Sequence, residues 1–261
     1  MRVSARPSLA LPGPDWAYFF DIDGTLAEFA ATPVEVRVDP ALRQRIEALL
    51  IASRGAVALI SGRSIADIDA LFPRGQIPVA GQHGAERRSA NGEVVRYTLP
   101  AARFDWLRAQ CNLRLRQYGG VRVEDKGGSL ALHYRAAPRL AGFVHRLARS
   151  LAAECDSELT VISGKRVVEL LPAGRTKGNA VLEFLNEPPF RGRLPVFVGD
   201  DESDETAFEI VNRLGGCSVK VGVGRTSARW RLPSVTAVRR WIERSRAAIP
   251  AQRVTARREA S

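Results

Sequence analysis

The sequence has few cysteines, a single methionine and no long apolar run. Its 261 residues include three cysteines, Cys111, Cys155 and Cys217. An odd number of widely spaced cysteines fits neither a disulfide framework nor a zinc cluster, so we interpret them as reduced packing residues. No stretch approaches the roughly 20 apolar residues that span a membrane. The N-terminal apolar segment "LAL" is too short for a signal peptide. We therefore expect a cytoplasmic protein without a membrane partner.

Acidic residues are also scarce relative to basic ones. The chain has 28 Asp and Glu against 39 Lys and Arg, a net charge of +11. Nucleic-acid binding requires such a basic excess on one face. However, seven arginines and two glutamates between Arg239 and the C-terminus supply +5 of this charge, and residues 249–261 read as a solvated, disordered tail. The remaining charge is scattered, without interleaved aromatics. We expect no nucleic-acid partner and a surface that attracts anionic substrates.

Apolar strands alternate with amphipathic helices in the first and last parts of the chain. Continuous apolar strands between such helices predict a parallel sheet that is covered on both faces. Asp39, Ser64 and Thr176 are placed to begin helices as N-caps. Two further strands are expected around the turn at Asn91 and Gly92. The strands are expected at residues 16–23, 55–62, 194–200 and 218–224, and the helices at 39–53, 64–72, 177–185 and 203–214.

The middle of the chain follows a different pattern, in which a helix precedes two strands and the order then repeats. Such a block predicts a small antiparallel sheet with helices on one face. The fold class is therefore α/β, with a parallel core interrupted by an inserted α+β domain. We predict a discontinuous core at 1–100 and 174–248, an inserted domain at 101–173 and a tail at 249–261. The helices of the insert are expected at 102–118 and 139–154, and its strands at 121–125, 129–135, 159–163 and 165–172.

The stretch Asp21-Ile22-Asp23-Gly24-Thr25 places two carboxylates just beyond an apolar strand. Residues i and i+2 of an extended chain face the same way, so both acids can enter one site. Their repulsion would be relieved by Mg²⁺, which prefers oxygen ligands. A carboxylate can also attack phosphorus while the other moves a proton. The alternative is an acidic turn between strand and loop.

Three other stretches place reactive side chains after a strand or at a helix start, where ligands bind in open α/β sheets. Ser61 and Gly62 follow a strand and can hold a phosphate oxygen, or form an ordinary turn. Lys177 enters a helix and can meet a phosphate, or be merely solvated. Asp200 ends a strand and can complete a metal shell, while Asp204 can support it or orient the lysine. The alternative for this acidic group, which also includes Asp201, is helix capping.

The order Asp-x-Asp, Ser, Lys and Gly-Asp-Asp-x-x-Asp resembles that of the haloacid dehalogenase superfamily of phosphatases. The resemblance implies that Asp21 is the nucleophile and Asp23 the acid/base. It also implies that Ser61, Gly62 and Lys177 bind phosphate, and that the inserted domain is a C2-type cap. The implied Mg²⁺ ligands are Asp21, the backbone carbonyl of Asp23 and Asp200, supported by Asp201 and Asp204.

A narrower resemblance comes from "AGQHGAERR", "VRVEDKGGSLALHYR" and "GKRVVELLPAGRTKGNAV", which are similar to segments of trehalose-6-phosphate phosphatases. It implies a Mg²⁺-dependent hydrolysis of trehalose 6-phosphate through an aspartyl-phosphate. Polar cap residues would contact the disaccharide. The implied sugar-binding residues are Glu124, Lys126, Lys165 and Glu169 of the cap strands, with His83 and Arg87 nearer the edge of the core.

Each of these sugar-binding assignments has an alternative. Glu124 and Lys126 could form a surface ion pair, Lys165 and Glu169 could lie on a solvated strand face, and His83 could be an edge histidine. The alternative functions are a sucrose-phosphate or mannosylglycerate-phosphate phosphatase, or a non-catalytic binding module. The sequence leaves the oligomeric state open.

Overall fold

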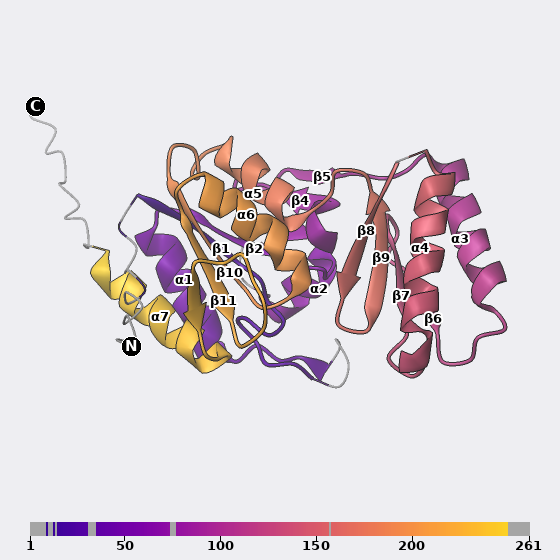
Figure 1. Cartoon of the computed structure of the whole chain (residues 1–261). Coiled ribbons are helices and arrows are strands. Elements are labelled where there is room, and N and C mark those ends of the chain that lie inside the picture. The colour runs from indigo at the N-terminus through magenta and orange to yellow at the C-terminus, as the bar shows by residue number, and fades with distance from the viewer. Residues whose placement is uncertain are drawn as a thin grey trace, which may run out of the picture.

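The computed structural model describes residues 9, 13, 15–30, 35–73, 77–156 and 158–249. Within them the strands form one eight-stranded and one four-stranded sheet. We call the large sheet with its helices the large unit, and the small sheet with its helices, residues 101–172, the small unit. Figure 1 shows the two units side by side, with the small unit at one end of the molecule.

The large sheet has the strand order β12-β11-β10-β1-β2-β3-β4-β5. Neighbouring strands from β12 to β3 are parallel, and β3, β4 and β5 are antiparallel to one another. The parallel part places the carboxyl ends of β10, β1 and β2 at one edge. The strands are β1 (Trp16–Phe20), β2 (Val57–Ile60), β3 (Val79–Gly81), β4 (Glu86–Arg88), β5 (Val94–Arg96), β10 (Leu194–Gly199), β11 (Cys217–Val221) and β12 (Trp230–Leu232).

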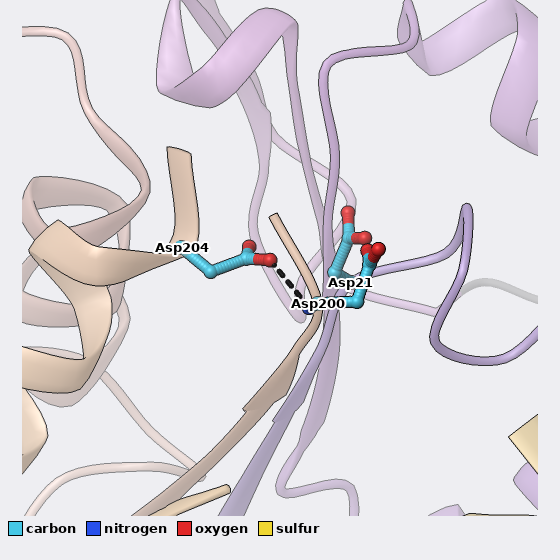
Figure 2. A group of neighbouring side chains, drawn as sticks. All are labelled: Asp21, Asp200 and Asp204. Carbon is cyan, nitrogen blue, oxygen red and sulfur yellow. Dashed lines mark hydrogen bonds between the residues drawn. The ribbon is translucent and has the colours of Figure 1, made fainter. Parts of the chain in front are cut away.

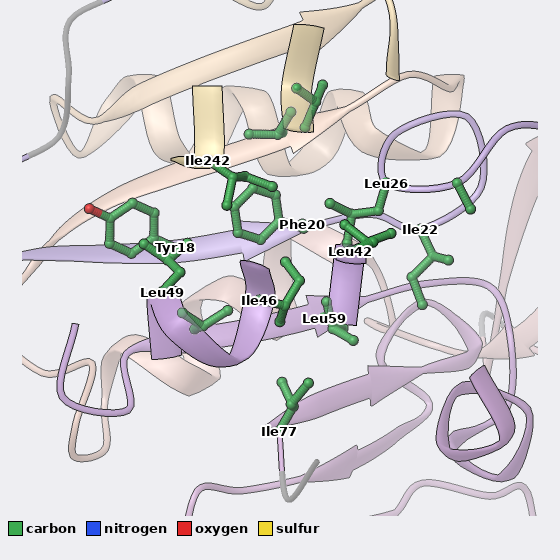
Figure 3. Packing of buried hydrophobic residues seen from close by; sticks show 14 of the residues in the cluster. Tyr18, Phe20, Ile22, Leu26, Leu42, Ile46, Leu49, Leu59, Ile77 and Ile242 are labelled. Carbon is green, nitrogen blue, oxygen red and sulfur yellow. The ribbon is translucent and has the colours of Figure 1, made fainter. Parts of the chain in front are cut away.

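Helices cover both faces of the large sheet, as predicted. Successive residues of a strand point to opposite faces, and β1 follows this rule: Tyr18 and Phe20 pack with α1 and α7, whereas Ala17 and Phe19 pack with α5 and α6. Figure 3 shows the first of these two clusters. Full burial of one large apolar side chain contributes roughly 1.5–3 kcal/mol. The helices are α1 (Pro40–Ala52), α2 (Ile65–Leu71), α5 (Lys177–Leu185), α6 (Glu205–Arg213) and α7 (Val235–Ala248).

The three predicted N-caps are confirmed. Asp39 accepts a hydrogen bond from the amide of Leu42 at the start of α1, and Pro40 occupies the first position of that helix. Ser64 and Asp67 form a reciprocal capping box at the start of α2. Thr176 accepts from the amide of Asn179 at the start of α5. These caps fix where each helix begins relative to the strand before it.

The small sheet has the order β6-β7-β9-β8 and is antiparallel throughout. Apolar residues on one face, including Leu132 and Val168, pack against α3 and α4. In Figure 1 these helices cover the outer face, and the opposite face is turned toward the large unit. Its elements are α3 (Ala101–Leu115), β6 (Arg122–Asp125), β7 (Leu130–His133), α4 (Ala141–Glu154), β8 (Leu159–Gly164) and β9 (Val167–Pro172).

Element types and order match the sequence expectation over most of the chain, including the β4–β5 hairpin. Short 3-10 turns, η2 (Gln82–Gly84), η3 (Pro138–Leu140) and η4 (Glu202–Asp204), replace parts of the expected strands and helices. No element was expected over residues 225–248, where the structure has β12 and α7. The cysteines are free and buried.

The chain leaves the large sheet after β5 and returns to it with β10, but the division into domains stays a prediction. Ile249, the first residue of the predicted tail, is buried, and residues 250–261 lie outside the described residues. No helix within the described ranges is both long and apolar enough to cross a membrane.

Candidate active site

The predicted reactive residues meet at the carboxyl edge of the large sheet. Asp21 follows β1, Ser61 follows β2 and Asp200 follows β10, and these three strands are neighbours. The backbone amide of Asp21 donates to the carbonyl of Val198, which fixes the end of β1 against β10. Lys177, the first residue of α5, reaches the same edge from the helix layer. Parallel pairing thus brings together residues more than 150 positions apart.

Lys177 joins two of the acids. Its ammonium lies 2.8 Å from Oδ1 of Asp21 and 2.6 Å from Oδ1 of Asp204. All three residues are almost completely buried. Burial acts to lower the pKa of Lys177, but Asp204 and Asp21 outweigh this effect and hold it above its usual range. The solvated alternative for Lys177 is therefore wrong.

Asp21 experiences a net excess of negative charge. Burial raises its pKa well above the usual range, and Asp204, Asp200 and Asp23 raise it further, against the lowering effect of Lys177. One ammonium is shared between Asp21 and Asp204, so the group remains negative. A cation bound at this point would stabilise the ionised form of Asp21, which is the form able to attack phosphorus.

Asp200 has one engaged and one unengaged carboxylate oxygen. Oδ2 accepts from the ammonium of Lys165 at 2.6 Å, whereas the buried Oδ1 has no hydrogen-bond partner among the described residues. Burial raises the pKa of Asp200 to about 6, and the Lys165 contact opposes that rise. Lys220, a buried lysine of β11, donates to the backbone carbonyl of Asp200. The unengaged oxygen is what a metal ligand would require.

The three acids fit a divalent cation. One carboxylate oxygen from each of Asp21, Asp200 and Asp204 lies within 4.8 Å of the other two. Figure 2 shows the carboxylates of Asp21 and Asp200 adjacent and pointing the same way, with that of Asp204 approaching from the other side. Oδ2 of Asp204 accepts from the amides of Asp200 and Asp201, at 2.7 and 2.8 Å. Asp21 and Asp200 therefore offer the more available oxygens, and Asp204 fixes the loop that carries Asp200.

Asp23 is held by an arginine. Both of its carboxylate oxygens accept from Arg63, at 2.6 and 2.7 Å. Gly24 follows with φ 82°, and a Cβ there would lie 2.5 Å from Oδ2 of Asp200 and 2.4 Å from the ring of Phe29. Only glycine allows this turn and this approach together. The side chain of Asp23 is 27% exposed and paired with Arg63, whereas Asp21 and Asp204 are buried.

Ser61 and Gly62 form the loop after β2. Ser61 is 1% exposed, its Oγ accepts from the amide of Arg63 at 3.2 Å, and its own amide donates to the carbonyl of Ala80. Gly62 faces His83, because a Cβ at Gly62 would lie 2.7 Å from Nε2 of that histidine. We call it the 61–63 loop; it contacts Asp23 through Arg63 and the small unit through the carbonyl of Gly62, which accepts from Lys126.

Two of the sugar-binding candidates, Lys126 of the small unit and His83 of the large unit, converge on Glu169, a buried residue of β9. Its carboxylate lies 3.0 Å from the ammonium of Lys126 and 3.5 Å from Nε2 of His83. Burial acts to raise the pKa of Glu169, but Lys126 and His83 outweigh it and lower the pKa to about 2. Lys126 also donates to the carbonyl of Gly62 at 3.1 Å. The solvated-face alternative for Glu169 is wrong, and this group bridges the two units.

Lys165 contacts the acids directly rather than the other sugar candidates. It lies in the turn between β8 and β9, half exposed, with its ammonium 2.6 Å from Asp200 and 3.7 Å from the centroid of the Phe29 ring. Asp201 accepts from the amide of Glu202 and caps η4. The capping alternative therefore describes the side chain of Asp201, although its amide binds Asp204.

Arg87 and Glu124 are not brought to the acids. Arg87 pairs with Glu183 and Glu187 on the α5 side, at 3.2 and 2.7 Å. Glu124 lies 2.6 Å from Nε2 of His133, so the expected alternative pair with Lys126 does not form. Glu124 does share a face of the small sheet with Glu169, since both are in register with Ala131.

Sequence reasoning missed Arg63 and Lys220. Arg63 lies in the stretch "SGRS", which carries no local signal for its role. Its assignment requires knowing that the guanidinium turns toward Asp23, 40 positions earlier. Lys220 gave a local signal, because a lysine in the apolar strand "SVKVGVG" must find a buried partner. The partner itself is not a local property.

Comparison with known proteins gives consistent results. A family model described as trehalose-phosphatase matches residues 19–236. The chain is 46% identical over 228 residues to trehalose-6-phosphate phosphatase of Escherichia coli (strain K12), covering 87% of this chain and 85% of that protein. The C-terminal domain of C. albicans trehalose-6-phosphate phosphatase superposes with a TM-score of 0.77 at 20% identity, over 90% of this chain and 92% of that one.

A haloacid dehalogenase-like hydrolase from Bacteroides thetaiotaomicron superposes with a TM-score of 0.62 at 15% identity, over 87% of this chain and 98% of that one. At such low sequence identities these similarities show the fold alone. They confirm the predicted fold class, an α/β core of the haloacid dehalogenase type with an added α+β unit.

Proposed function

The chain belongs to the trehalose-phosphatase family and is a phosphoric monoester hydrolase, and from this premise we propose that it hydrolyses trehalose 6-phosphate to trehalose and phosphate. The observation that carries the proposal is the group of Asp21, Lys177 and Asp200 at the carboxyl edge of the sheet, in which Asp21 and Lys177 are buried. The 46% identity to the named Escherichia coli enzyme supports the choice of substrate.

In the first step an oxygen of Asp21 attacks phosphorus. An Asp21–phosphorus bond forms while the bond from phosphorus to the sugar's C6 oxygen breaks, and the electron pair of that bond leaves with the oxygen. Asp23 donates a proton to this alkoxide, which completes trehalose. Both oxygens of Asp23 accept from Arg63, so one of them must turn away from the guanidinium before Asp23 can donate.

In the second step water attacks the phosphorus of the aspartyl-phosphate. Asp23, now ionised, accepts the proton of the water, and the bond between phosphorus and Asp21 breaks to release phosphate. Lys177 lies 2.8 Å from Asp21 and can neutralise charge on the phosphoryl oxygens in both steps. The hydroxyl of Ser61 and the amides near Gly62 can bind the same oxygens.

Mg²⁺ would be held by Asp21, the carbonyl of Asp23 and Asp200, with Asp204 and Asp201 as supporting groups. When bound it supplies positive charge beside the transferring phosphoryl group. The unengaged buried Oδ1 of Asp200 supports this assignment. The nearness of the Asp21 and Asp200 carboxylates, which would otherwise repel one another, supports it as well.

The small unit would act as a cap that encloses the sugar. Glu169, Lys126 and His83 offer hydrogen-bond donors and acceptors to sugar hydroxyls between the two units. Closure of such a cap excludes water and commits the substrate. Lys165 reaches Asp200 from the same side and would bind near the phosphate. Glu124 shares the inward face, and Arg87 is better described as a structural residue.

A phosphate-release panel tests the proposal. Purified protein with Mg²⁺ is assayed on trehalose 6-phosphate, sucrose 6-phosphate, mannosylglycerate phosphate and glucose 6-phosphate. We expect kcat/KM to be highest for trehalose 6-phosphate by at least about tenfold, the discrimination that one or two buried hydrogen bonds provide. Preference for another ester would overturn the substrate, and no activity on any ester would favour a non-catalytic module.

A further inference from the structure

The η2 turn, Gln82–Gly84, lies where the two units meet and has an unusual backbone. Gln82, His83 and Gly84 have φ values of 46°, 56° and 102°. Residues other than glycine rarely adopt such positive φ values. Two non-glycine residues in succession therefore indicate a conformation imposed by surrounding contacts. Gln82 and His83 are 5% and 7% exposed. The contacts that impose the conformation lie on both sides of the turn.

On the side of the large unit, the turn is bonded through its backbone to the 61–63 loop. The amide of Gln82 donates to the carbonyl of Arg63 at 2.8 Å, and the amide of His83 donates to the carbonyl of Ser61 at 2.9 Å. The turn and the loop assigned to phosphate therefore have a fixed relative position.

On the side of the small unit, the Gln82 side chain forms two hydrogen bonds with the turn between β6 and β7. Its amide nitrogen donates to the backbone carbonyl of Lys126 at 3.0 Å, and its amide oxygen accepts from Oγ of Ser129 at 2.5 Å. Ser129 is 1% exposed. The carbonyl can only accept a hydrogen bond, so the orientation of the amide is determined. We call these two hydrogen bonds the Gln82 contact.

The Gln82 contact determines where the Lys126 side chain starts. The backbone amide of Lys126 donates a hydrogen bond to the carbonyl of Ser129 and so closes the turn. Gln82 binds this turn at both of these residues. From there its ammonium lies 3.1 Å from the carbonyl of Gly62 and 3.0 Å from Glu169. A shift of the turn away from the large unit would move the ammonium away from the 61–63 loop.

We propose that Gln82 is a positioning residue for substrate recognition: it docks the β6–β7 turn onto the large unit and so sets Lys126 beside the 61–63 loop. This inference rests on the proposed function, because Lys126 is assigned there to the sugar. The Gln82 contact acts on binding of the sugar part and leaves the reacting acids untouched. Gln82 has no contact with Asp21, Asp23 or Asp200 among the hydrogen bonds of the described residues.

The variant Gln82→Glu tests the proposal at constant side-chain shape. It replaces the nitrogen that donates to the Lys126 carbonyl at 3.0 Å, and more weakly to Oε1 of Glu86 at 3.5 Å, by a carboxylate oxygen. KM for trehalose 6-phosphate is expected to rise about tenfold, the scale of one lost buried hydrogen bond, while kcat changes less than about twofold. Hydrolysis of p-nitrophenyl phosphate, which has no sugar to bind, is expected to stay within about twofold. Ser129→Ala removes the other hydrogen bond and is expected to raise KM about threefold to fivefold.

Controls separate positioning from general damage. Gln44→Ala, an exposed glutamine of α1, is expected to leave both substrates unaffected. The double variant Gln82→Glu, Ser129→Ala should show less than the product of the two single effects, since both act on one contact. An unchanged KM in Gln82→Glu, or an equal loss on both substrates, would overturn the proposal.

A measurement independent of activity distinguishes this proposal from the proposed function. Hydrogen exchange of the Lys126 amide, which is bonded to Ser129, is expected to be at least about tenfold faster in Gln82→Glu than in the wild type. Unchanged exchange across residues 125–130 would refute the Gln82 contact even in an active enzyme. A wild type inactive on every ester but with faster exchange in the variant would refute the function and retain the contact.

Discussion

Lys177 and Asp204 form a buried ion pair in which the lysine ammonium lies 2.6 Å from a carboxylate oxygen. The pair joins the start of α5 to η4, and the same ammonium reaches Asp21. A single positive charge therefore contacts both Asp21, the proposed nucleophile, and Asp204, which holds the loop that carries Asp200. Stability and the proposed chemistry are therefore linked at this ion pair.

Lys177→Met would leave two buried carboxylates without their counter-ion. We expect the free energy of unfolding to fall by about 3–5 kcal/mol, the cost of breaking a buried ion pair from one side. Urea unfolding without Mg²⁺ measures it. Lys165→Met is the matched control, because that lysine is half exposed and its loss should cost less than about 1 kcal/mol. Equal losses in the two variants would contradict the role of Lys177.

Asp21→Asn removes the proposed nucleophile while keeping the size of the side chain. Phosphate release from trehalose 6-phosphate should fall by at least about a thousandfold, with substrate binding by calorimetry largely retained. In the wild type, acid quenching during turnover should leave phosphoryl label on the peptide that contains Asp21. Asp15→Asn, an exposed acid before β1, serves as the control. Retained turnover in Asp21→Asn would refute the assignment.

Asp200→Asn separates the destabilising effect of the Asp200 charge on folding from its proposed role as a Mg²⁺ ligand. The pKa of Asp200 is raised to about 6, so the folded state is destabilised by this acid above that pH and gains stability as pH falls through 6. Near pH 8, metal-free Asp200→Asn should therefore be more stable than the wild type by about 1–3 kcal/mol.

Mg²⁺ should reverse that order. Excess Mg²⁺ is expected to raise the melting temperature of the wild type and leave that of Asp200→Asn unchanged, because ligand binding stabilises only a protein with an intact site. Differential scanning fluorimetry measures both effects. Asp201→Asn should keep the Mg²⁺ shift, and a Mg²⁺ shift in Asp200→Asn would argue against Asp200 as a ligand.

Glu169 should make stability depend on acid pH. Its pKa is lowered to about 2 from 4.5, so its ionised form stabilises the fold above pH 4.5, and this contribution is lost as pH falls toward 2. Glu169→Gln should be less stable than the wild type at neutral pH, and the difference should shrink by about 1.5 kcal/mol by about pH 3.5. Urea unfolding across this range measures it. Glu93→Gln, at an exposed position, should show no such convergence.

Much of the fold was predictable because its signals are local. The apolar runs of β1, β2 and β10 and the caps Asp39 and Thr176 are properties of short segments. Two local assignments failed. The helix α7 went unassigned even though Val238, Trp241 and Ile242 have helical spacing and are buried, and part of the strand expected before Asn91 became the η2 turn, Gln82–Gly84.

The sequence by itself determined that Asp21, Ser61 and Asp200 end apolar strands of a parallel sheet, and parallel pairing brings strand ends to one edge. Only the tertiary structure decided the partners: Arg63 for Asp23, Asp204 for Lys177, and Gln82 for Ser129. The physical reason is the distance along the chain over which each feature is determined. A strand or a cap depends on a few consecutive residues, whereas a buried polar group must find its partner across the packed elements, and that geometry exists only once the whole chain has folded.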